Sequence, residues 1–266
     1  MTNFQLLYDT RTWDAATVTA SDTKGGSPSN VLKDQIAKSW LSNGFTGKTL
    51  TFDLASASAT YMLGIFAHNL TAAATVHHLA NTSNVWSGGG FSGGYDSGAL
   101  TVATDGDSRV LPRLVYTLNR TYRWHRFTFD DPTNTASEGG IKIGRVMGGS
   151  YYTFVRNFAL RGRISYKDAN PITHLPGSVE NVVNDPTKRF REIRLDFPRR
   201  TATEKRKLRA IFGLCGISRP MVLALDIDNY PSEMSAYGYL VADMEEVLRT
   251  YEMSDFLTMV FGEKTF

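Results

Sequence analysis

The chain has 266 residues, of which 42% are hydrophobic and 21% are charged, and this balance excludes a disordered chain. The formal net charge is only +3, so charge over the whole chain gives no reason to expect a nucleic-acid partner. The one cysteine, Cys215, excludes an internal disulfide, and its apolar helical surroundings favour a buried thiol.

Two further features bear on where the protein works. No run of apolar residues reaches the about 18 that a membrane helix needs, so we expect no membrane contact. The N-terminal residues Met1-Thr-Asn-Phe4 show neither a basic region nor an apolar region of a secretion signal. We therefore expect synthesis in a cytoplasm, without implying that the protein stays there.

Short alternating segments dominate residues 1–165. From residue 48 to 54, the apolar side chains of Leu50, Phe52 and Leu54 alternate with polar ones, which is typical of a half-buried strand. Many short strands with few helices favour a β-sandwich or jelly roll. Further strands are predicted at Phe4–Tyr8, Tyr61–His68, Thr75–Leu79, Leu100–Ala103, Tyr122–Phe129, Ile141–Val146 and Tyr152–Phe158.

Two segments depart from this alternation. Residues 27–40 are predicted to form a loop with a short helical turn that packs Trp40 against the sheet. Residues 86–98 are so rich in glycine that a regular strand would carry a large entropic cost. We interpret them as a long exposed loop that carries the aromatic side chains of Trp86, Phe91 and Tyr95.

The pattern changes near residue 166. Residues 166–188 are rich in Pro, Asn, Asp and Gly and are predicted to be a linker or an extended arm. Beyond it, Ile193, Leu195 and Phe197 lie on one face of a predicted strand. Thr201 and Glu204 have the spacing of a capping box at a helix start, and Gly216 supplies a stop. Further strands are predicted at Met221–Ile227, Tyr237–Ala242 and Phe256–Phe261.

The predicted fold class is therefore mainly β. An N-terminal jelly-roll β-sandwich spans residues 1–165, and residues 189–266 form a small β-sheet domain with one packed helix. Residues 166–188 connect the two domains.

Motifs for catalysis and metal binding are absent from the sequence. His77 and His78 are adjacent on a predicted strand, so their side chains face opposite sides of the sheet and cannot both bind one metal. No nucleophile elbow or phosphate-binding loop occurs. Asp105 and Asp107 could offer oxygen ligands to calcium, but a turn is the favoured interpretation. We predict no catalytic residue, metal or cofactor, and an enzyme only if distant carboxylates meet in space.

The first domain resembles the galactose-binding-like, or discoidin-like, β-sandwich family. The resemblance is carried by the order of its parts: Ser39-Trp40, Leu50–Leu54, Met62–Asn69, and then Tyr122–Phe129 with Ile141–Gly148 as paired closing strands. It implies ligand binding, often of carbohydrate, through loops at one end of the sandwich.

The sugar-binding residues of that family cannot be matched here position by position. The loop aromatics Trp86, Phe91 and Tyr95 are instead a ligand-binding hypothesis, because aromatic faces stack on sugar rings and on proteins alike. Packing of this loop against a neighbouring subunit is the alternative.

The whole arrangement also resembles tail-tip and baseplate proteins of tailed phages, and Phe190–Ile227 resembles the ring-forming domains of distal tail proteins. Residues 188–209 carry ten Lys or Arg and three Asp or Glu, whereas residues 221–266 carry nine acidic and two basic residues. Such segregation suits head-to-tail contacts that close a ring. Nucleic-acid contact and simple exposure to solvent are the alternatives. The hypothetical assembly interface comprises Arg191, Arg194, Arg199, Arg200, Lys205 and Arg209.

The sequence thus favours a non-enzymatic structural protein of a phage virion, located in the tail tip or baseplate. Its expected partners are copies of itself in a ring, other phage tail proteins and a host-surface glycan. The alternative is a carbohydrate-binding module with an accessory C-terminal domain.

Overall fold

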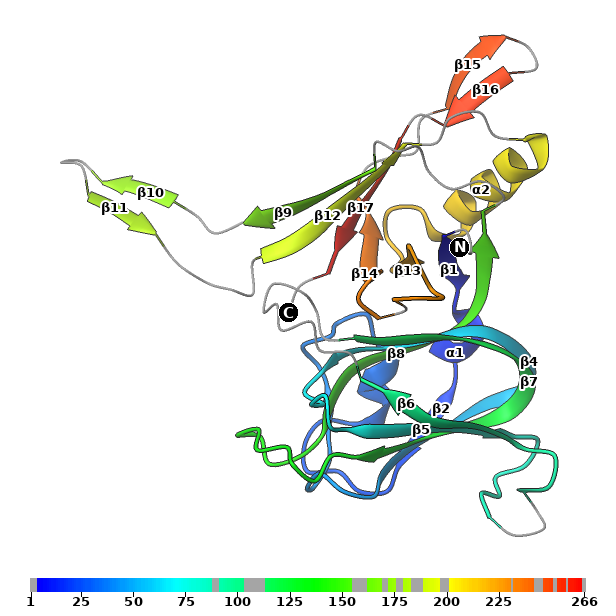
Figure 1. Ribbon diagram of the computed structural model, residues 1–266, viewed down its shortest axis with the longest axis vertical. Coiled ribbons are helices and arrows are strands. Elements are labelled where there is room, and N and C mark those ends of the chain that lie inside the picture. The colour runs from blue at the N-terminus through cyan, green and yellow to red at the C-terminus, as the bar shows by residue number, and fades with distance from the viewer. Residues whose placement is uncertain are drawn as a thin grey trace. The chain divides into compact units, whose positions relative to one another are not determined.

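The computed structural model describes residues 4–87, 91–102, 113–154, 162–168, 172–175, 179–182, 189–196, 201–230, 232–241, 246–250, 253–256 and 258–264. The chain forms two compact units. The first comprises Met1–Asp105, Pro112–Tyr152 and Ala224–Ser235, and the second comprises Gly106–Leu111, Thr153–Leu223 and Ala236–Phe266. Strands dominate both units, which confirms the predicted mainly β fold class (Figure 1).

The elements of the first unit are mostly strands. They are β1 (Gln5–Asp9), α1 (Arg11–Asp14), β2 (Thr17–Ala20), the 3-10 turn η1 (Pro28–Leu32), β3 (Trp40–Leu41), β4 (Lys48–His68), β5 (Thr75–Asn81), β6 (Tyr95–Thr101), β7 (Arg113–Asp130) and β8 (Lys142–Thr153), whose last residue belongs to the second unit.

Two long strands build the sandwich. The strand order is β6-β5-β7-β4-β8-β1, with β2 also paired to β4 and β3 paired to β8. The first part of β4 pairs with β2, and its last part pairs with β8, while β7 follows β4 along its length. The pairing of β4 with β7 is irregular between Asp53 and Ser58, and Ala55 adopts a φ of 64° there. This irregularity lets both strands bend from one layer into the other (Figure 1).

The core of the first unit lies between these layers. Leu50, Phe52 and Phe127 contribute from one layer and Leu63 and Ile65 from the other, all with no exposed surface. Burial alternates with period two along β5 and the last part of β7, as the sequence pattern predicts, whereas Met62–His68 of β4 and Ile143–Gly149 of β8 are buried at every residue. Fully buried rings complete the core: Trp13, Trp40 and Phe129.

Three predictions for this unit can be compared with the structure. The turn η1 precedes a fully buried Trp40, as residues 27–40 predicted. The predicted strands Tyr61–His68 and Tyr122–Phe129 are each the second half of a much longer strand. The expected pairing of Tyr122–Phe129 with Ile141–Gly148 is wrong, because β4 lies between β7 and β8 and pairs with both.

The second unit is also mainly β. Its elements are β9 (Arg163–Asp168), β10 (Ile172–Leu175), β11 (Val179–Val182), β12 (Arg189–Asp196), α2 (Ala202–Cys215), β13 (Met221–Ala224), β14 (Ser235–Leu240), β15 (Glu246–Thr250), β16 (Met253–Phe256) and β17 (Thr258–Glu263). The last residue of β13 and the first residue of β14 belong to the first unit.

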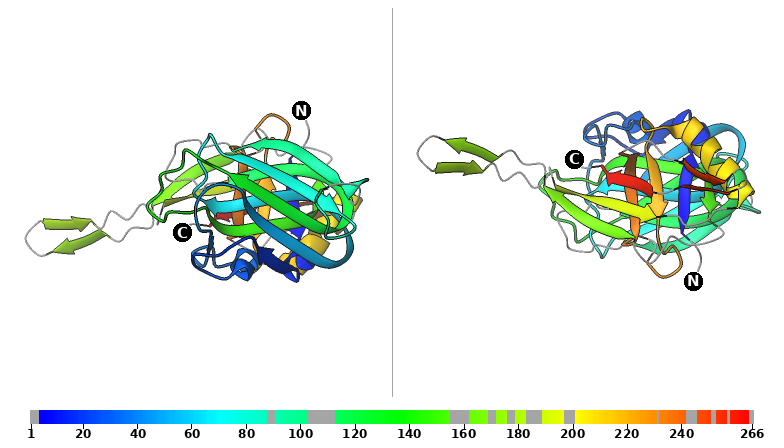
Figure 2. Two further views of the ribbon diagram at one scale, coloured as in Figure 1. Left: turned by 90° about the horizontal axis from the view of Figure 1, so that it is seen from below. Right: turned by 90° about the horizontal axis from the view of Figure 1, so that it is seen from above.

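The strands of this unit pair in the order β13-β14-β17-β12-β9. Within residues 166–188, β10 and β11 form an antiparallel hairpin, which both views of Figure 2 show. A second hairpin joins β15 and β16.

Helix α2 begins and ends where the sequence predicts. The side chain of Thr201 accepts a hydrogen bond from the Glu204 amide, and Glu204 accepts one from the Thr201 amide, which completes the capping box. Gly216 follows the helix with a φ of 53°. Leu208, Ile211 and Cys215 form its buried face. No helix in the described part of the chain is long and apolar enough to cross a membrane.

Candidate functional site

The outer face of β7 carries large polar and aromatic side chains. His125 and Phe127 point into the core and have no exposed surface, so the alternating Trp124 and Arg126 point outward, and both are only half-buried. Register places Arg126 opposite Thr51 of β4 and Leu79 of β5. These side chains therefore lie at the middle of a paired sheet rather than at a loop tip.

Trp86 lies on this same outer face. The guanidinium carbon of Arg126 lies 4.6 Å from the centre of the Trp86 ring, a cation–π arrangement. Arg126 is oriented from its other side by Thr51, whose hydroxyl accepts a hydrogen bond from Nε at 2.9 Å. The guanidinium is therefore held between a strand and an indole ring.

The segment that carries Trp86 is fixed to the sheet by amide side chains. Asn81, the last residue of β5, donates from Nδ2 to the carbonyl of Val85 at 2.8 Å. Trp86 donates from Nε1 to Oδ1 of Asn84 at 2.7 Å. These bonds place the indole ring beside β7.

Trp124 has a second guanidinium beside it. The guanidinium carbon of Arg123 lies 5.2 Å from the centre of the Trp124 ring. Arg123 also donates from Nε and Nη2 to both carboxylate oxygens of Asp53, at 2.7 and 2.8 Å. These hydrogen bonds hold the pKa of Asp53 below its usual value, although partial burial opposes the shift.

We call this surface the tryptophan–arginine face and define it by Trp86, Arg123, Trp124 and Arg126. It combines two indole rings with donor and acceptor groups, which suits a ligand that has apolar ring faces and hydroxyl groups. The sequence analysis identified Trp86 but not the three residues of β7. For Trp124 and Arg126 the signal was available in the predicted strand Tyr122–Phe129, because both alternate with the buried residues. For Arg123 it was not, because this residue has the strand parity of the buried residues and only its contacts with Asp53 and Trp124 place it here.

The other two predicted aromatics, Phe91 and Tyr95, have environments of their own. Tyr95 is the first residue of β6 and not part of an exposed loop; it pairs with Ala80 and packs on His78, with ring centres 5.8 Å apart. Its ring faces the core side of the hairpin, whereas Trp86 faces the outer side. Phe91 is half-buried in a turn closed by a hydrogen bond from the Gly94 amide. The structure therefore places Trp86 and Tyr95 on different sides of the sheet, and a shared ligand surface with Phe91 stays a prediction.

The inner side of the same strands holds a pair of buried histidines. His78 and His125 are in contact through Nε2 and Nδ1 at 3.0 Å, and both lack exposed surface. Burial lowers the pKa of His125 to about 4 and that of His78 well below its usual value. His77 points the other way and lies 3.5 Å from Asp96, as the alternation predicted. The pair belongs to the core and is closed to ligands.

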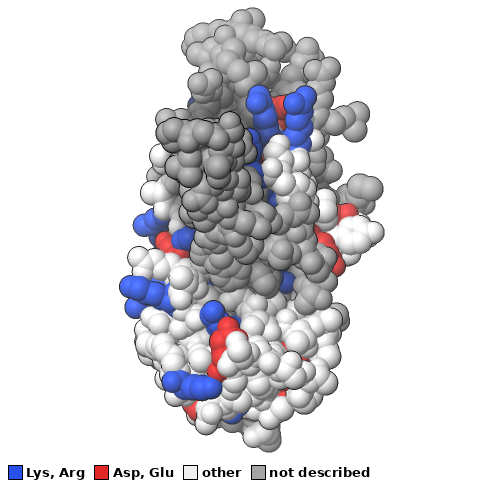
Figure 3. Space-filling view, turned by 90° about the vertical axis from the view of Figure 1, so that its left-hand side faces the viewer, with Lys and Arg blue, Asp and Glu red and all other residues white. Residues whose placement is uncertain are grey.

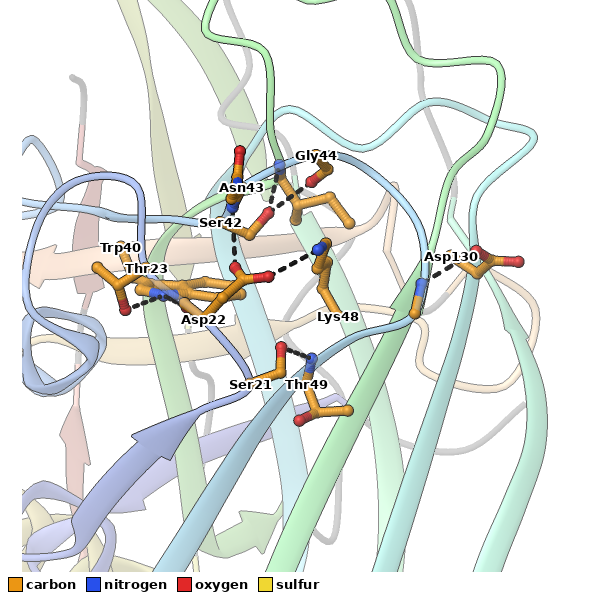
Figure 4. A network of polar contacts seen from close by, with 12 residues as sticks. Ser21, Asp22, Thr23, Trp40, Ser42, Asn43, Gly44, Lys48, Thr49 and Asp130 are labelled. Carbon is orange, nitrogen blue, oxygen red and sulfur yellow. Dashed lines mark hydrogen bonds and ion pairs between the residues drawn. The ribbon is translucent and has the colours of Figure 1, made fainter.

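A network of polar contacts ties loops of the first unit together (Figure 4). Asp22 accepts from Lys48 Nζ at 2.6 Å and from the Asn43 amide at 2.8 Å. Burial alone would raise the pKa of Asp22, but these partners lower it. Trp40 donates from Nε1 to the carbonyl of Asp22 at 3.1 Å. Because these groups bind one another, the network holds the loops of this unit in position.

The predicted assembly residues occupy different environments. Arg191 is buried and forms a two-pronged ion pair with Glu263, and Lys205 is buried in α2. Arg194 and Arg209 are exposed. Arg199 and Arg200, like Asp105 and Asp107, lie outside the described residues. On the face shown in Figure 3, basic and acidic side chains of the described residues lie close to one another.

Within the described ranges, no three side chains of His, Cys, Asp or Glu come together as a metal site.

Comparison with known proteins gives no match to a family model or to a curated protein. Solved structures similar to this chain include a family 32 carbohydrate-binding module of C. perfringens NanJ in complex with galactose (12% identity, TM-score 0.38, 56% of this chain and 99% of that chain). Others are a fucose-binding module of Streptococcus pneumoniae (10%, 0.37, 51% and 91%) and a module of Clostridium perfringens in complex with GalNAc-β-1,3-galactose (9%, 0.39, 53% and 99%).

These neighbours are sugar-binding β-sandwich modules, the kind of domain that the first sequence resemblance named. At such identities and TM-scores the likeness carries no argument about ligand or function. Nothing in the comparisons bears on the resemblance to phage tail proteins, which stays a prediction.

Proposed function

We propose that the first unit binds saccharides through the tryptophan–arginine face, without catalysis. The observation that supports this proposal is the placement of Trp86 and Trp124 on one outer face beside guanidinium and carboxylate groups. The apolar faces of sugar rings pack on indole, and their hydroxyl groups pair with such charged donors and acceptors. An open sheet surface suits a chain of sugars that lies along it.

The arrangement is also held ready for a ligand. Arg126 is fixed by Thr51, Arg123 by Asp53, and the segment before Trp86 by Asn81. Side chains already ordered in the free protein lose little rotamer entropy on binding, so more of the contact energy appears as affinity.

The proposal is tested by replacing Trp86 with alanine. A glycan array with neutral and acidic saccharides identifies a bound saccharide, and calorimetry then compares the native chain with the variant. We expect Trp86→Ala to weaken binding at least tenfold, or about 1.4 kcal/mol. The melting temperature should change little, because the ring lies outside the core.

Tyr61→Ala is the matched control, because Tyr61 is a 38% exposed aromatic of the same unit whose ring packs on Tyr151. It should bind as the native chain does. Equal affinity of Trp86→Ala and the native chain would exclude this face as the binding site. Release of sugar from the bound saccharide would contradict the absence of catalysis.

A further inference from the structure

Arg126 carries a positive charge that is half-buried and has no acidic partner among the described residues. The contacts that hold it are the Thr51 hydroxyl and the Trp86 ring, and neither bears a negative charge. Burial lowers the pKa of its guanidinium, although an arginine remains protonated. The charged form is therefore partly removed from water without an ion pair to offset the loss.

Arg123, its neighbour on the same face, shows the opposite arrangement. Arg123 donates from Nε and Nη2 to the two carboxylate oxygens of Asp53, so this ion pair carries no net charge. The tryptophan–arginine face thus has one neutralised guanidinium and one that is not. Arg126, the guanidinium that is not neutralised, is the position on this face at which a bound anion would be stabilised most.

We propose that Arg126 binds the anionic group of an acidic saccharide while the sugar ring packs on exposed parts of the Trp86 and Trp124 rings. This inference rests on the proposed function and names its ligand class. A guanidinium offers parallel N–H donors that match the two oxygens of a carboxylate, and a sulfate ester presents the same chemistry. Residues two apart on a strand are about 7 Å apart, which is the scale of one sugar unit with its charged group.

A single-stranded nucleic acid also combines rings with negative charge, but the face does not suit it as well. Nucleic-acid surfaces follow a row of phosphates with several cations. Here Arg126 is the one guanidinium of the face without a described carboxylate partner, because the carboxylate of Asp53 neutralises Arg123.

The experiment compares polygalacturonate with its methyl ester, which keeps the rings and removes the charge. Dextran sulfate and dextran form a second pair, and an oligo(dT) strand is the nucleic-acid probe. Affinities are measured by calorimetry on the full chain. We expect the charged member of at least one pair to bind at least tenfold more tightly, and the two pairs distinguish a carboxylate from a sulfate.

Two variants locate the effect. Arg126→Gln should abolish the difference in affinity between the charged and the neutral member of the pair. Arg11→Gln removes the same charge from an exposed position in α1, where Arg11 pairs with Asp9, and should leave the difference intact. A loss of equal size in both variants would mean unspecific charge attraction and would overturn the inference.

The remaining outcomes separate the two proposals. Equal affinity for charged and neutral members would overturn the acidic ligand and leave saccharide binding standing. Tighter binding of oligo(dT) than of every saccharide would overturn the inference in favour of nucleic acid. Binding of none of the probes, with no saccharide bound on the array, would overturn both.

Discussion

At the scale of single residues, buried histidines make the stability of the folded protein depend on pH. His68, His78 and His125 are buried, and burial favours the neutral ring in each. The pKa values of His68 and His125 are lowered to about 4, compared with 6.5 for an unperturbed ring. Between these two values the unfolded chain binds more protons than the folded chain.

Stability should therefore fall as the pH is lowered from about 7 to about 4, because a pKa depressed in the folded state means that protonation favours unfolding. Each of His68 and His125 contributes on the order of 3 kcal/mol at most across this window. Urea unfolding at a series of pH values measures the slope. His125→Gln should flatten it, and His77→Gln, at an exposed position, should not. An unchanged slope in His125→Gln would contradict this account.

At the scale of elements, strand pairing in the second unit depends on a buried ion pair. Arg191 of β12 donates from Nε and Nη2 to the two carboxylate oxygens of Glu263 of β17, at 2.8 and 2.7 Å. Both side chains are almost fully buried, at 6% and 0% exposure. Two ions removed from water are tolerated only as long as each satisfies the other.

Removing one partner should therefore cost far more than removing both. We expect Arg191→Met to destabilise the protein by about 3 to 5 kcal/mol, since it leaves the Glu263 carboxylate buried and unpaired. The double variant Arg191→Met, Glu263→Leu should recover most of that loss. Arg194→Met, at a 57% exposed position of the same strand, serves as the control and should change the free energy of unfolding by about 0.5 kcal/mol or less. Equal effects of the two single variants would disprove the importance of the pair.

For the whole molecule, assembly into a ring of a phage tail tip stays a prediction. The sequence based it on a basic segment and an acidic segment that could meet between copies. In the structure, one residue from each segment already pairs within the chain, because Arg191 binds Glu263. Part of the expected intermolecular attraction is thus used internally.

Negative-stain electron microscopy of the full chain at low and moderate salt measures this prediction. Rings that disappear as the salt concentration rises would support contact between unlike charged surfaces, since salt screens exposed charges. Single particles under every condition would contradict the prediction that the chain alone forms rings. Saccharide binding would then be the better supported role.

Local patterns in the sequence were sufficient for part of the elements. Alternating residues predicted the strands and the inward side of Leu50, Phe52, Ile193 and Leu195, because a strand has a side-chain period of two whatever its partners are. The capping box and Gly216 predicted both ends of α2, because those interactions are local.

Tertiary structure alone decided the pairing and the candidate site. The sequence could not show that β4 lies between β7 and β8, because strand order depends on contacts between distant residues. It could not show that Tyr95 faces the core while Trp86 turns outward beneath Arg126, because the two residues lie at the two ends of one glycine-rich segment that has no side-chain periodicity. That Asp53 neutralises Arg123 and leaves Arg126 without a described carboxylate is likewise a result of register, which brings residues some 70 positions apart within hydrogen-bonding distance.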